Sequence, residues 1–224
     1  MSDPNRPTDP DPHWGTATLG VRAGEMRSEF GEHSAAIHAT SSFVFDSAEA
    51  ADRRFSGDAP GLIYSRFTNP TVQGFERKLA AMEGGDTAVA TASGMSAILA
   101  LLLATLRAGD HLVAAQGLFG STTGLLNNII GRFGVETSYV APAETDGWRA
   151  AVRPNTRLFL AESPTNPLCE LTDIPALAAI ARDVGVLLAI DNCFCTPALQ
   201  KPLDLGAHLV LHRQPLRHPR HGPG

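Results

Sequence analysis

The chain has 224 residues, of which 43% are hydrophobic and 18% are charged. This composition is typical of a globular protein with a sizeable core, and the length allows one large domain or two small ones. The net charge of −5 at pH 7 does not favour binding of the chain as a whole to nucleic acid, which is itself negatively charged. Residues 212–224 nevertheless contain three arginines and no acidic residue, so the charge is distributed unevenly.

Cysteine usage and hydropathy indicate a cytoplasmic protein. Cys169, Cys193 and Cys195 are an odd number in a long chain, which suits a reducing compartment and excludes a disulfide framework. The N-terminus has no apolar signal-peptide region, and the longest apolar run, 97–106, is too short to span a bilayer. Cys193 and Cys195 could bind a metal with Cys169 or His212, but their spacing is not that of a metal-binding pair. We therefore expect neither a membrane segment nor a metal site.

The first 60 residues carry only weak patterns. The opening segment, to about Pro12, is rich in Pro and Asp, and we expect it to be disordered. A helix is predicted at 47–55. Two interpretations of this region stay open: a poorly ordered leader, or an arm that crosses onto a partner subunit.

Helices and strands alternate from Asn69 onward. A helix is predicted to begin at Asn69-Pro70 and to stop at Gly84-Gly85, because apolar residues recur between them at helical spacing. Further helices are predicted at 95–106, at 120–133, around Trp148 and at 174–184. Strands are predicted at 87–91, 111–115, 135–140, 157–161, 186–190 and 207–211.

This alternation predicts an α/β fold, in which helices sandwich a mostly parallel sheet. The predicted strands are continuous apolar runs, as expected for strands buried on both faces. Ligands of such sheets bind outside the carboxyl ends of the strands. The residues that follow each strand are therefore the candidates for chemistry.

Four predicted strand ends carry candidate ligand-binding residues. Gly94 opens a helix whose first amides could hold a phosphate, although a glycine is also common in such turns. Phe119 could stack on a flat ligand or pack in the core, and Asn166 lies in a proline-rich loop. Asp191 could hold a protonated ring nitrogen or cap a helix. Together these groups match the requirements of pyridoxal 5'-phosphate (PLP), whereas the glycine fingerprint of a nucleotide-dependent dehydrogenase is absent.

Four motifs resemble the Cys/Met-metabolism family of PLP-dependent enzymes, in the family's order, between about His13 and His212. They are Tyr-Ser-Arg-Phe-Thr-Asn-Pro-Thr at 64–71, Ser-Gly-Met at 93–95, Glu-Ser-Pro-Thr-Asn-Pro at 162–167 and Asp-Asn at 191–192. Within the family, the segments most similar to the sulfhydrylases of O-succinylhomoserine are 32–34, 40–45, 119–122 and 191–200. The resemblance implies a fold type I, PLP-dependent transferase-like large domain that is incomplete at its C-terminus.

The resemblance also assigns cofactor-binding residues. Gly94 and Met95 would bind the phosphate through backbone N–H groups. Phe119 would stack on the ring, and Asn166 would donate a hydrogen bond to its phenolic oxygen. Asp191 would keep the pyridine nitrogen protonated, which makes the ring an electron sink.

Three further residues receive roles from the resemblance. Tyr64 and Arg66 would bind the phosphate of the neighbouring subunit, for which an always-charged, bidentate donor is suited. A complete site then needs at least a dimer, and enzymes of this family are usually tetramers built from dimers. Glu162 would support the site in a way that the resemblance does not define.

The sequence departs from the family after His212. At this point the family has Ser-Ala-Thr-Lys, whose lysine holds the cofactor as a Schiff base and moves protons. This chain has Arg-Gln-Pro-Leu, with Leu216 at the lysine position. The resemblance therefore assigns no catalytic residue to this chain.

The expected organisation is an N-terminal arm at 1–60, a partial PLP-binding large domain at 61–212 and an aberrant basic tail at 213–224. The family's C-terminal domain is expected to be absent. Our hypothesis for the tail is a reading-frame change or truncation near His212. A basic tail that binds RNA or a membrane is the rival interpretation.

The implied reaction is a γ-replacement of methionine and transsulfuration metabolism, in which O-succinylhomoserine and sulfide give homocysteine and succinate. A homoserine ester and sulfide are the expected substrates, and further copies of the chain are the expected partners. We expect this chain alone to be an inactive fragment. The alternatives are a cystathionine γ-synthase or γ-lyase of the same family, and a non-catalytic remnant or binding module.

Overall fold

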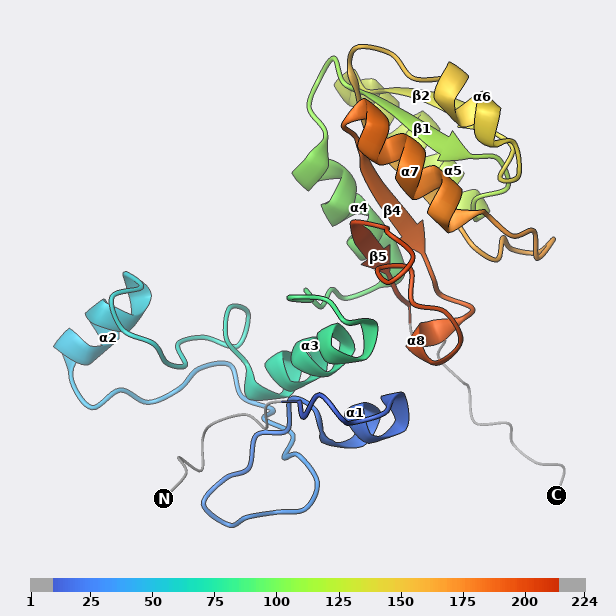
Figure 1. Ribbon diagram of the computed structural model, residues 1–224. Coiled ribbons are helices and arrows are strands. Elements are labelled where there is room, and N and C mark those ends of the chain that lie inside the picture. The colour runs from blue at the N-terminus through green and yellow to red at the C-terminus, as the bar shows by residue number, and fades with distance from the viewer. Residues whose placement is uncertain (1–9, 214–224) are drawn as a thin grey trace, which may run out of the picture. The chain divides into compact units, whose positions relative to one another are not determined.

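The computed structural model describes residues 10–213, which form two compact units with a boundary between Ala90 and Thr91. The first unit holds α1 (Thr16–Arg22), α2 (Ala48–Phe55) and α3 (Pro70–Glu83). The second unit holds the sheet and the other helices (Figure 1). Leu216 and most of the predicted basic tail lie outside the described residues.

In the first unit, α3 begins and ends where the sequence predicts. Asn69 precedes it, and its side chain accepts a hydrogen bond from the Thr71 N–H at 2.9 Å. Gly84 ends it with a positive φ of 75°, which favours glycine. The neighbouring α1 packs against α3 next to Gly24, where an added Cβ would lie 2.7 Å from the Gly74 carbonyl oxygen. The absence of a side chain at Gly24 therefore permits this close approach.

The arm segment also pairs with the chain before α3. Ser42 and Tyr64 form an antiparallel bridge, and the Ser65 N–H donates to the Ser41 carbonyl at 2.9 Å. Part of the predicted arm is thus tied by backbone hydrogen bonds to the segment that carries Tyr64.

The second unit is built on a parallel sheet with the strand order β2-β1-β3-β4-β5. The strands are β1 (His111–Ala115), β2 (Glu136–Val140), β3 (Thr156–Glu162), β4 (Leu187–Asp191) and β5 (Leu209–Leu211). The inner strands β1, β3 and β4 are almost wholly buried, whereas the two edge strands are partly exposed. These runs are apolar because helices cover both faces, which confirms the predicted α/β fold.

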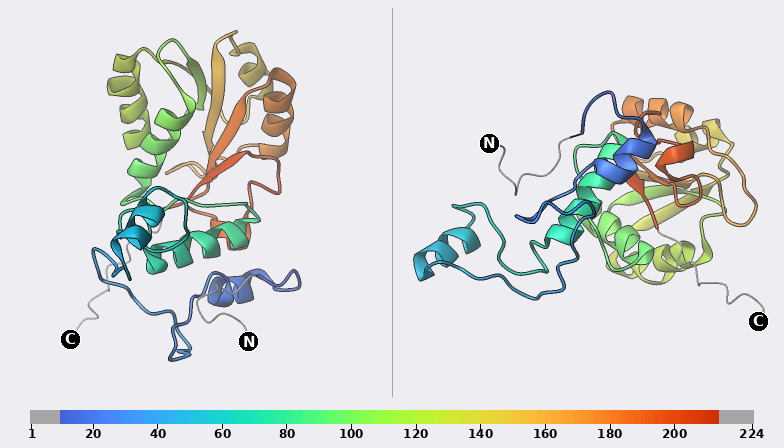
Figure 2. Two further views of the ribbon diagram at one scale, coloured as in Figure 1. Left: turned by 90° about the vertical axis from the view of Figure 1, so that its left-hand side faces the viewer. Right: turned by 90° about the horizontal axis from the view of Figure 1, so that it is seen from below.

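Helices cover both faces of the sheet (Figure 2). One layer contains α4 (Gly94–Thr105) and α5 (Gly120–Asn128), and the other contains α6 (Thr145–Ala150) and α7 (Ile174–Val184). Trp148 of α6 is fully buried, and its ring lies edge-on to Phe159 of β3 with centroids 5.3 Å apart. The connections run outward from β1 to β2 and in the opposite direction from β3 to β5. The order therefore reverses between β1 and β3, where ligands of such sheets collect.

Some predicted elements are corrected by the structure. The strand predicted at 87–91 is wrong, because no described strand pairs with it and the Ala90 N–H donates to Glu76 Oε1 at 2.8 Å. The single helix predicted at 120–133 is divided into α5 and a 3-10 turn, η1 (Ile130–Phe133). Two short helices, α1 and α8 (Thr196–Leu199), were not predicted. Within residues 10–213, no helix has the length and apolar character needed to cross a bilayer.

Candidate cofactor site

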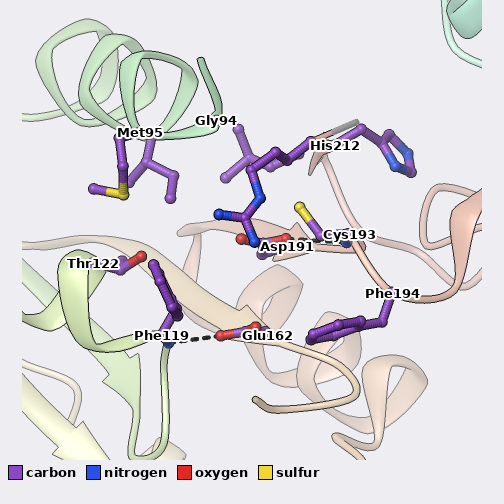
Figure 3. Close-up of a pocket in the computed structure, with 12 residues that line it drawn as sticks. Gly94, Met95, Phe119, Thr122, Glu162, Asp191, Cys193, Phe194 and His212 are labelled. Carbon is purple, nitrogen blue, oxygen red and sulfur yellow. Dashed lines mark hydrogen bonds between the residues drawn. The ribbon is translucent and has the colours of Figure 1, made fainter. Parts of the chain in front are cut away.

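A pocket in the second unit lies at the carboxyl ends of β3, β4 and β5, beside the start of α4 (Figure 3). The sheet register places the strand ends next to one another. Glu162 of β3 pairs with Asp191 of β4, and Asp191 pairs with Leu211 of β5. Phe119, which follows β1 and precedes α5, also lines the pocket. The parallel sheet thus gathers side chains that are far apart in the sequence.

The first turn of α4 forms one wall of the pocket. Ser93 caps the helix, and its Oγ accepts a hydrogen bond from the Ser96 N–H at 3.1 Å. Gly94 and Met95 line the pocket. The first amides of a helix have no acceptor within the helix, and the helix dipole adds a positive potential there. This wall can therefore bind a phosphate dianion.

Glu162 fixes the backbone next to the aromatic wall. Its Oε2 accepts a hydrogen bond from the Phe119 N–H at 2.8 Å, drawn as a dashed line in Figure 3. Glu162 is only 3% exposed. The contact joins the end of β3 to the start of α5, so it sets the position from which the Phe119 ring enters the pocket.

Asp191 supplies the second carboxylate. It is buried at the end of β4, and its Oδ1 accepts a hydrogen bond from the Cys193 N–H at 3.1 Å. In Figure 3, Asp191 lies across the pocket from Met95 and Phe119. A buried carboxylate requires hydrogen bonds or a cation as a partner. It could therefore hold the protonated nitrogen of a flat ring.

Burial changes the acidity of two groups in the pocket. It raises the pKa of Glu162 to about 7; the Phe119 hydrogen bond and the Arg213 charge oppose the rise, while the Asp191 charge adds to it. Burial, followed by the neighbouring Asp191, raises the pKa of the Cys193 thiol far above its usual range. This shift disfavours the thiolate, which is the nucleophilic form of cysteine.

A pair of amides holds the strand ends in place. The Asn192 side chain is fully buried and donates to the Gln200 carbonyl at 2.9 Å. In return, Gln200 Nε2 donates to Asn192 Oδ1 at 2.9 Å and to the Ser163 carbonyl at 3.0 Å. The Asn192 N–H also donates to the Leu211 carbonyl at 2.9 Å. The loops that leave β3 and β4 are thus joined to each other, and the second of them is joined to β5.

The structure brings most of the sequence-predicted residues together. The pocket is lined by Gly94, Met95, Phe119, Glu162 and Asp191. Asn166 is a partly exposed loop residue after β3 and is not among the lining residues.

Two other predicted residues belong to the first unit. Arg66 lies over the rings of Tyr64 and Phe67, with its guanidinium carbon 5.2 Å from each centroid. A role for Tyr64 and Arg66 toward a neighbouring subunit's phosphate remains a prediction.

Sequence reasoning missed Thr122 and Arg213, which also line the pocket. Arg213 was assigned to the basic tail, yet it follows β5 by two residues. The rule that placed Phe119 and Asp191 at strand ends could have found Arg213 as well. Its guanidinium carbon lies 5.3 Å from the centroid of the Phe119 ring.

The donor set of the pocket fits PLP, but the space does not accommodate its ring in this conformation. Helix amides suit a phosphate, Phe119 offers an aromatic face and Asp191 offers a carboxylate. The free volume is only about 20 Å³, which is enough for a water molecule. Arg213 also lines the pocket, with its side chain exposed to solvent. No group of three or more metal-binding side chains is gathered anywhere in residues 10–213.

Comparisons with known proteins match this arrangement. The family model described as "Cys/Met metabolism PLP-dependent enzyme" matches residues 17–214. The chain is 55% identical over 195 residues to O-succinylhomoserine sulfhydrylase of Pseudomonas aeruginosa, covering 87% of this chain and 48% of that protein. It is 42% identical to L-methionine gamma-lyase of Porphyromonas gingivalis, covering 88% of this chain and 50% of the relative.

The fold of this chain is similar to that of a solved structure. An O-acetylhomoserine (thiol)-lyase from Campylobacter jejuni, whose structure contains a pyridoxyl-lysine phosphate, matches with a TM-score of 0.85 and 27% identity. The match covers 90% of this chain and 50% of that one. The fold is that of type I PLP-dependent enzymes, and the chain spans about half the length of the curated relatives it matches. The family match over nearly the whole chain establishes that this chain belongs to the Cys/Met metabolism PLP-dependent enzyme family.

Proposed function

We propose that the chain is the cofactor-holding half of a sulfhydrylase that acts on O-succinylhomoserine. In the reaction, the bond between Cγ and the succinyl oxygen breaks, a bond between Cγ and sulfur forms, and homocysteine and succinate leave. The observation that carries the proposal is the convergence of helix amides, an aromatic ring and two carboxylates at neighbouring strand ends. The 55% identity to an O-succinylhomoserine sulfhydrylase supports the choice of substrate.

Each lining residue has a role in holding the cofactor. Gly94 and Met95 would bind the phosphate through the first amides of α4. Phe119 would stack on the ring, held in place by the Glu162 hydrogen bond. Asp191 would keep the ring nitrogen protonated. We also propose a cofactor-binding role for Asn166, whose side-chain amide would reach the phenolic oxygen of the ring from the loop after β3.

The chain's own residues bind and orient, but they do not supply the proton-transfer group. Bound PLP supplies a ring that withdraws electrons and stabilises negative charge on the substrate carbons. A base must then move protons between those carbons. The resemblance places this base at residue 216, which is Leu216 here. We therefore propose that the chain by itself is not catalytic, which also keeps a non-catalytic binding module as a second candidate.

The complete site would combine copies of the chain. Tyr64 and Arg66 are proposed to hold the phosphate of a neighbouring subunit, so that a dimer is the smallest complete unit and a pair of dimers the assembly. Arginine suits this role because its guanidinium binds two phosphate oxygens at once.

A chimera tests the proposed reaction. Residues 13–212 would replace the matching part of the Pseudomonas aeruginosa relative, which then supplies the remaining half. We expect the chimera to form homocysteine from O-succinylhomoserine and sulfide at least about tenfold faster than from the acetyl ester, since loss of a specific polar contact costs about 1.4 kcal/mol or more. The chain alone should form none.

The measurement is the release of homocysteine and succinate, with methionine as a competing substrate. A chimera that binds PLP but eliminates the γ-substituent of methionine faster than it replaces succinate would contradict the proposal. That outcome would favour a γ-lyase. The same chimera with Asp191→Asn serves as the inactive control.

A further inference from the structure

Arg213 extends across the pocket from one wall to the other. A Cβ added to Gly94 would lie 2.9 Å from Arg213 Cδ, 3.0 Å from its Cβ and 3.1 Å from its Cγ. The aliphatic stem therefore lies directly on the first turn of α4. The guanidinium carbon lies 5.3 Å from the centroid of the Phe119 ring, within the range of a cation–π contact.

The charges around Arg213 favour this position. Glu162 and Asp191 are the acidic residues of the pocket lining, and the Arg213 charge acts on Glu162 and on Cys193. The other basic residue of the lining is His212, and Figure 3 shows its ring directed away from Phe119. Arg213 is thus the permanent cation among the residues that line the described pocket, which also include two buried carboxylates.

The shape of the pocket follows from the same side chain. Its free volume is about 20 Å³. A cavity that accepts a six-membered aromatic ring has a volume of about 150 Å³. With Arg213 in this position, the free volume of the pocket is therefore too small for the ring.

We propose that Arg213, whose side chain is exposed to solvent, is a plug that covers the ring position of the cofactor site and must swing out before a ring can bind. A guanidinium and a protonated pyridine ring are both flat cations. Each can lie on Phe119 and face the carboxylate of Asp191. The same two groups of the pocket, Phe119 and Asp191, would therefore bind either the guanidinium or the ring. The Arg213 side chain and the cofactor ring thus compete for one position. This inference rests on the proposed function, because it takes the pocket to be a cofactor site.

A binding experiment with three chains tests the plug. The ligand is pyridoxine 5'-phosphate, which has the ring and the phosphate but no aldehyde, so it cannot react with Lys78 or Lys201. Isothermal titration calorimetry would compare the unchanged chain, Arg213→Ala and Arg132→Ala. Arg132 is an exposed residue of η1, and its loss changes the net charge by the same amount outside the pocket.

We expect Arg213→Ala to bind the ligand at least about tenfold more tightly than the unchanged chain, a difference of about 1.4 kcal/mol. Arg132→Ala should bind like the unchanged chain. Arg213→Gln, which keeps most of the stem but not the charge, should bind with an intermediate affinity. It also provides the comparison if Arg213→Ala does not fold.

Two other outcomes would contradict the plug, and they differ in whether the proposed cofactor site is retained. Equal or weaker binding by Arg213→Ala would show that Arg213 does not compete with the ring, or that it holds the phosphate; the cofactor site itself would stand. Absence of binding by every folded variant would remove the cofactor site, and the plug with it.

Discussion

The surroundings of Glu162 in the pocket favour opposite protonation states of its carboxyl group. It is almost fully buried, and it accepts the hydrogen bond that holds the Phe119 backbone. An ionised carboxylate accepts this bond more strongly, but burial and Asp191 favour the protonated form. The pKa of about 7 is the result of this balance. Glu162 therefore keeps the aromatic wall in position at the cost of a pH-dependent stability.

The sign of that dependence follows from the raised pKa. The folded chain binds a proton at Glu162 more tightly than the unfolded chain, whose pKa is near 4.5. The stability from this proton is fully present below about 4.5 and is lost as the pH rises through about 7. Glu162→Gln keeps an oxygen acceptor for the Phe119 N–H but cannot ionise. We expect it to be more stable than the unchanged chain above pH 7 and to flatten the slope between these values, as measured by urea unfolding.

Glu170→Gln is the matched control, because Glu170 is exposed and undergoes the same chemical change. It should retain the slope of the unchanged chain. If Glu162→Gln retained that slope too, the burial of Glu162 would not be the source of the pH dependence.

At the scale of an element, β1 begins at a polar junction opposite the pocket. The fully buried His111 ring contacts Thr156 Oγ1 of β3 through Nδ1 at 2.8 Å. Its Nε2 contacts Ser138 Oγ of β2 at 2.9 Å. Arg153 Nη2 donates to the same Ser138 oxygen at 3.2 Å. The ring thus joins three strands at one end, while the other end of the sheet carries the pocket.

His111→Phe should keep most of the ring's volume and remove both contacts. The buried hydroxyl group of Thr156 and the partly buried hydroxyl group of Ser138 would each lose a partner, which costs about 1–3 kcal/mol of unfolding free energy. Burial, followed by the Arg153 charge, lowers the pKa of His111 below 6.5, with Glu136 opposing. The stability from the neutral ring is therefore present above 6.5 and is lost as the pH falls, and His111→Phe should lack this loss.

Urea unfolding followed by circular dichroism, above and below pH 6.5, would measure both effects. Tyr139→Phe is the control, since it removes one exposed hydrogen bond, to Asn127. A cost for His111→Phe no larger than that of Tyr139→Phe would contradict the structural role of the ring.

At the scale of the whole molecule, sequence patterns predicted the sheet because its inner strands are apolar and regularly spaced. The same regularity predicted the pocket, since Phe119, Glu162 and Asp191 follow strands whose ends meet at one edge. The strand predicted at 87–91 failed because β-branched residues favour extended backbone but do not specify a pairing partner. Arg213 was missed because it was assigned to the basic tail, although it follows the strand predicted at 207–211 by two residues and makes specific contacts.

The sequence patterns also did not predict the division of the chain into two compact units. The boundary between Ala90 and Thr91 lies inside the segment that was predicted as a strand. Local propensity describes single elements, whereas a boundary depends on which elements contact one another. Apolar patterning therefore predicted the sheet of the second unit but not the position at which one unit ends.

The central claim is that the strand ends of this chain form the ring site of a PLP enzyme. The most direct test is the affinity for pyridoxine 5'-phosphate with and without the Asp191 carboxylate, measured in the Arg213→Ala background so that the plug does not enter the comparison. We expect Asp191→Asn to weaken binding at least about tenfold, because the amide cannot pair with the protonated ring nitrogen. Asp183→Asn, at an exposed residue of α7, should have no effect. Equal affinity with and without the Asp191 carboxylate would contradict the claim.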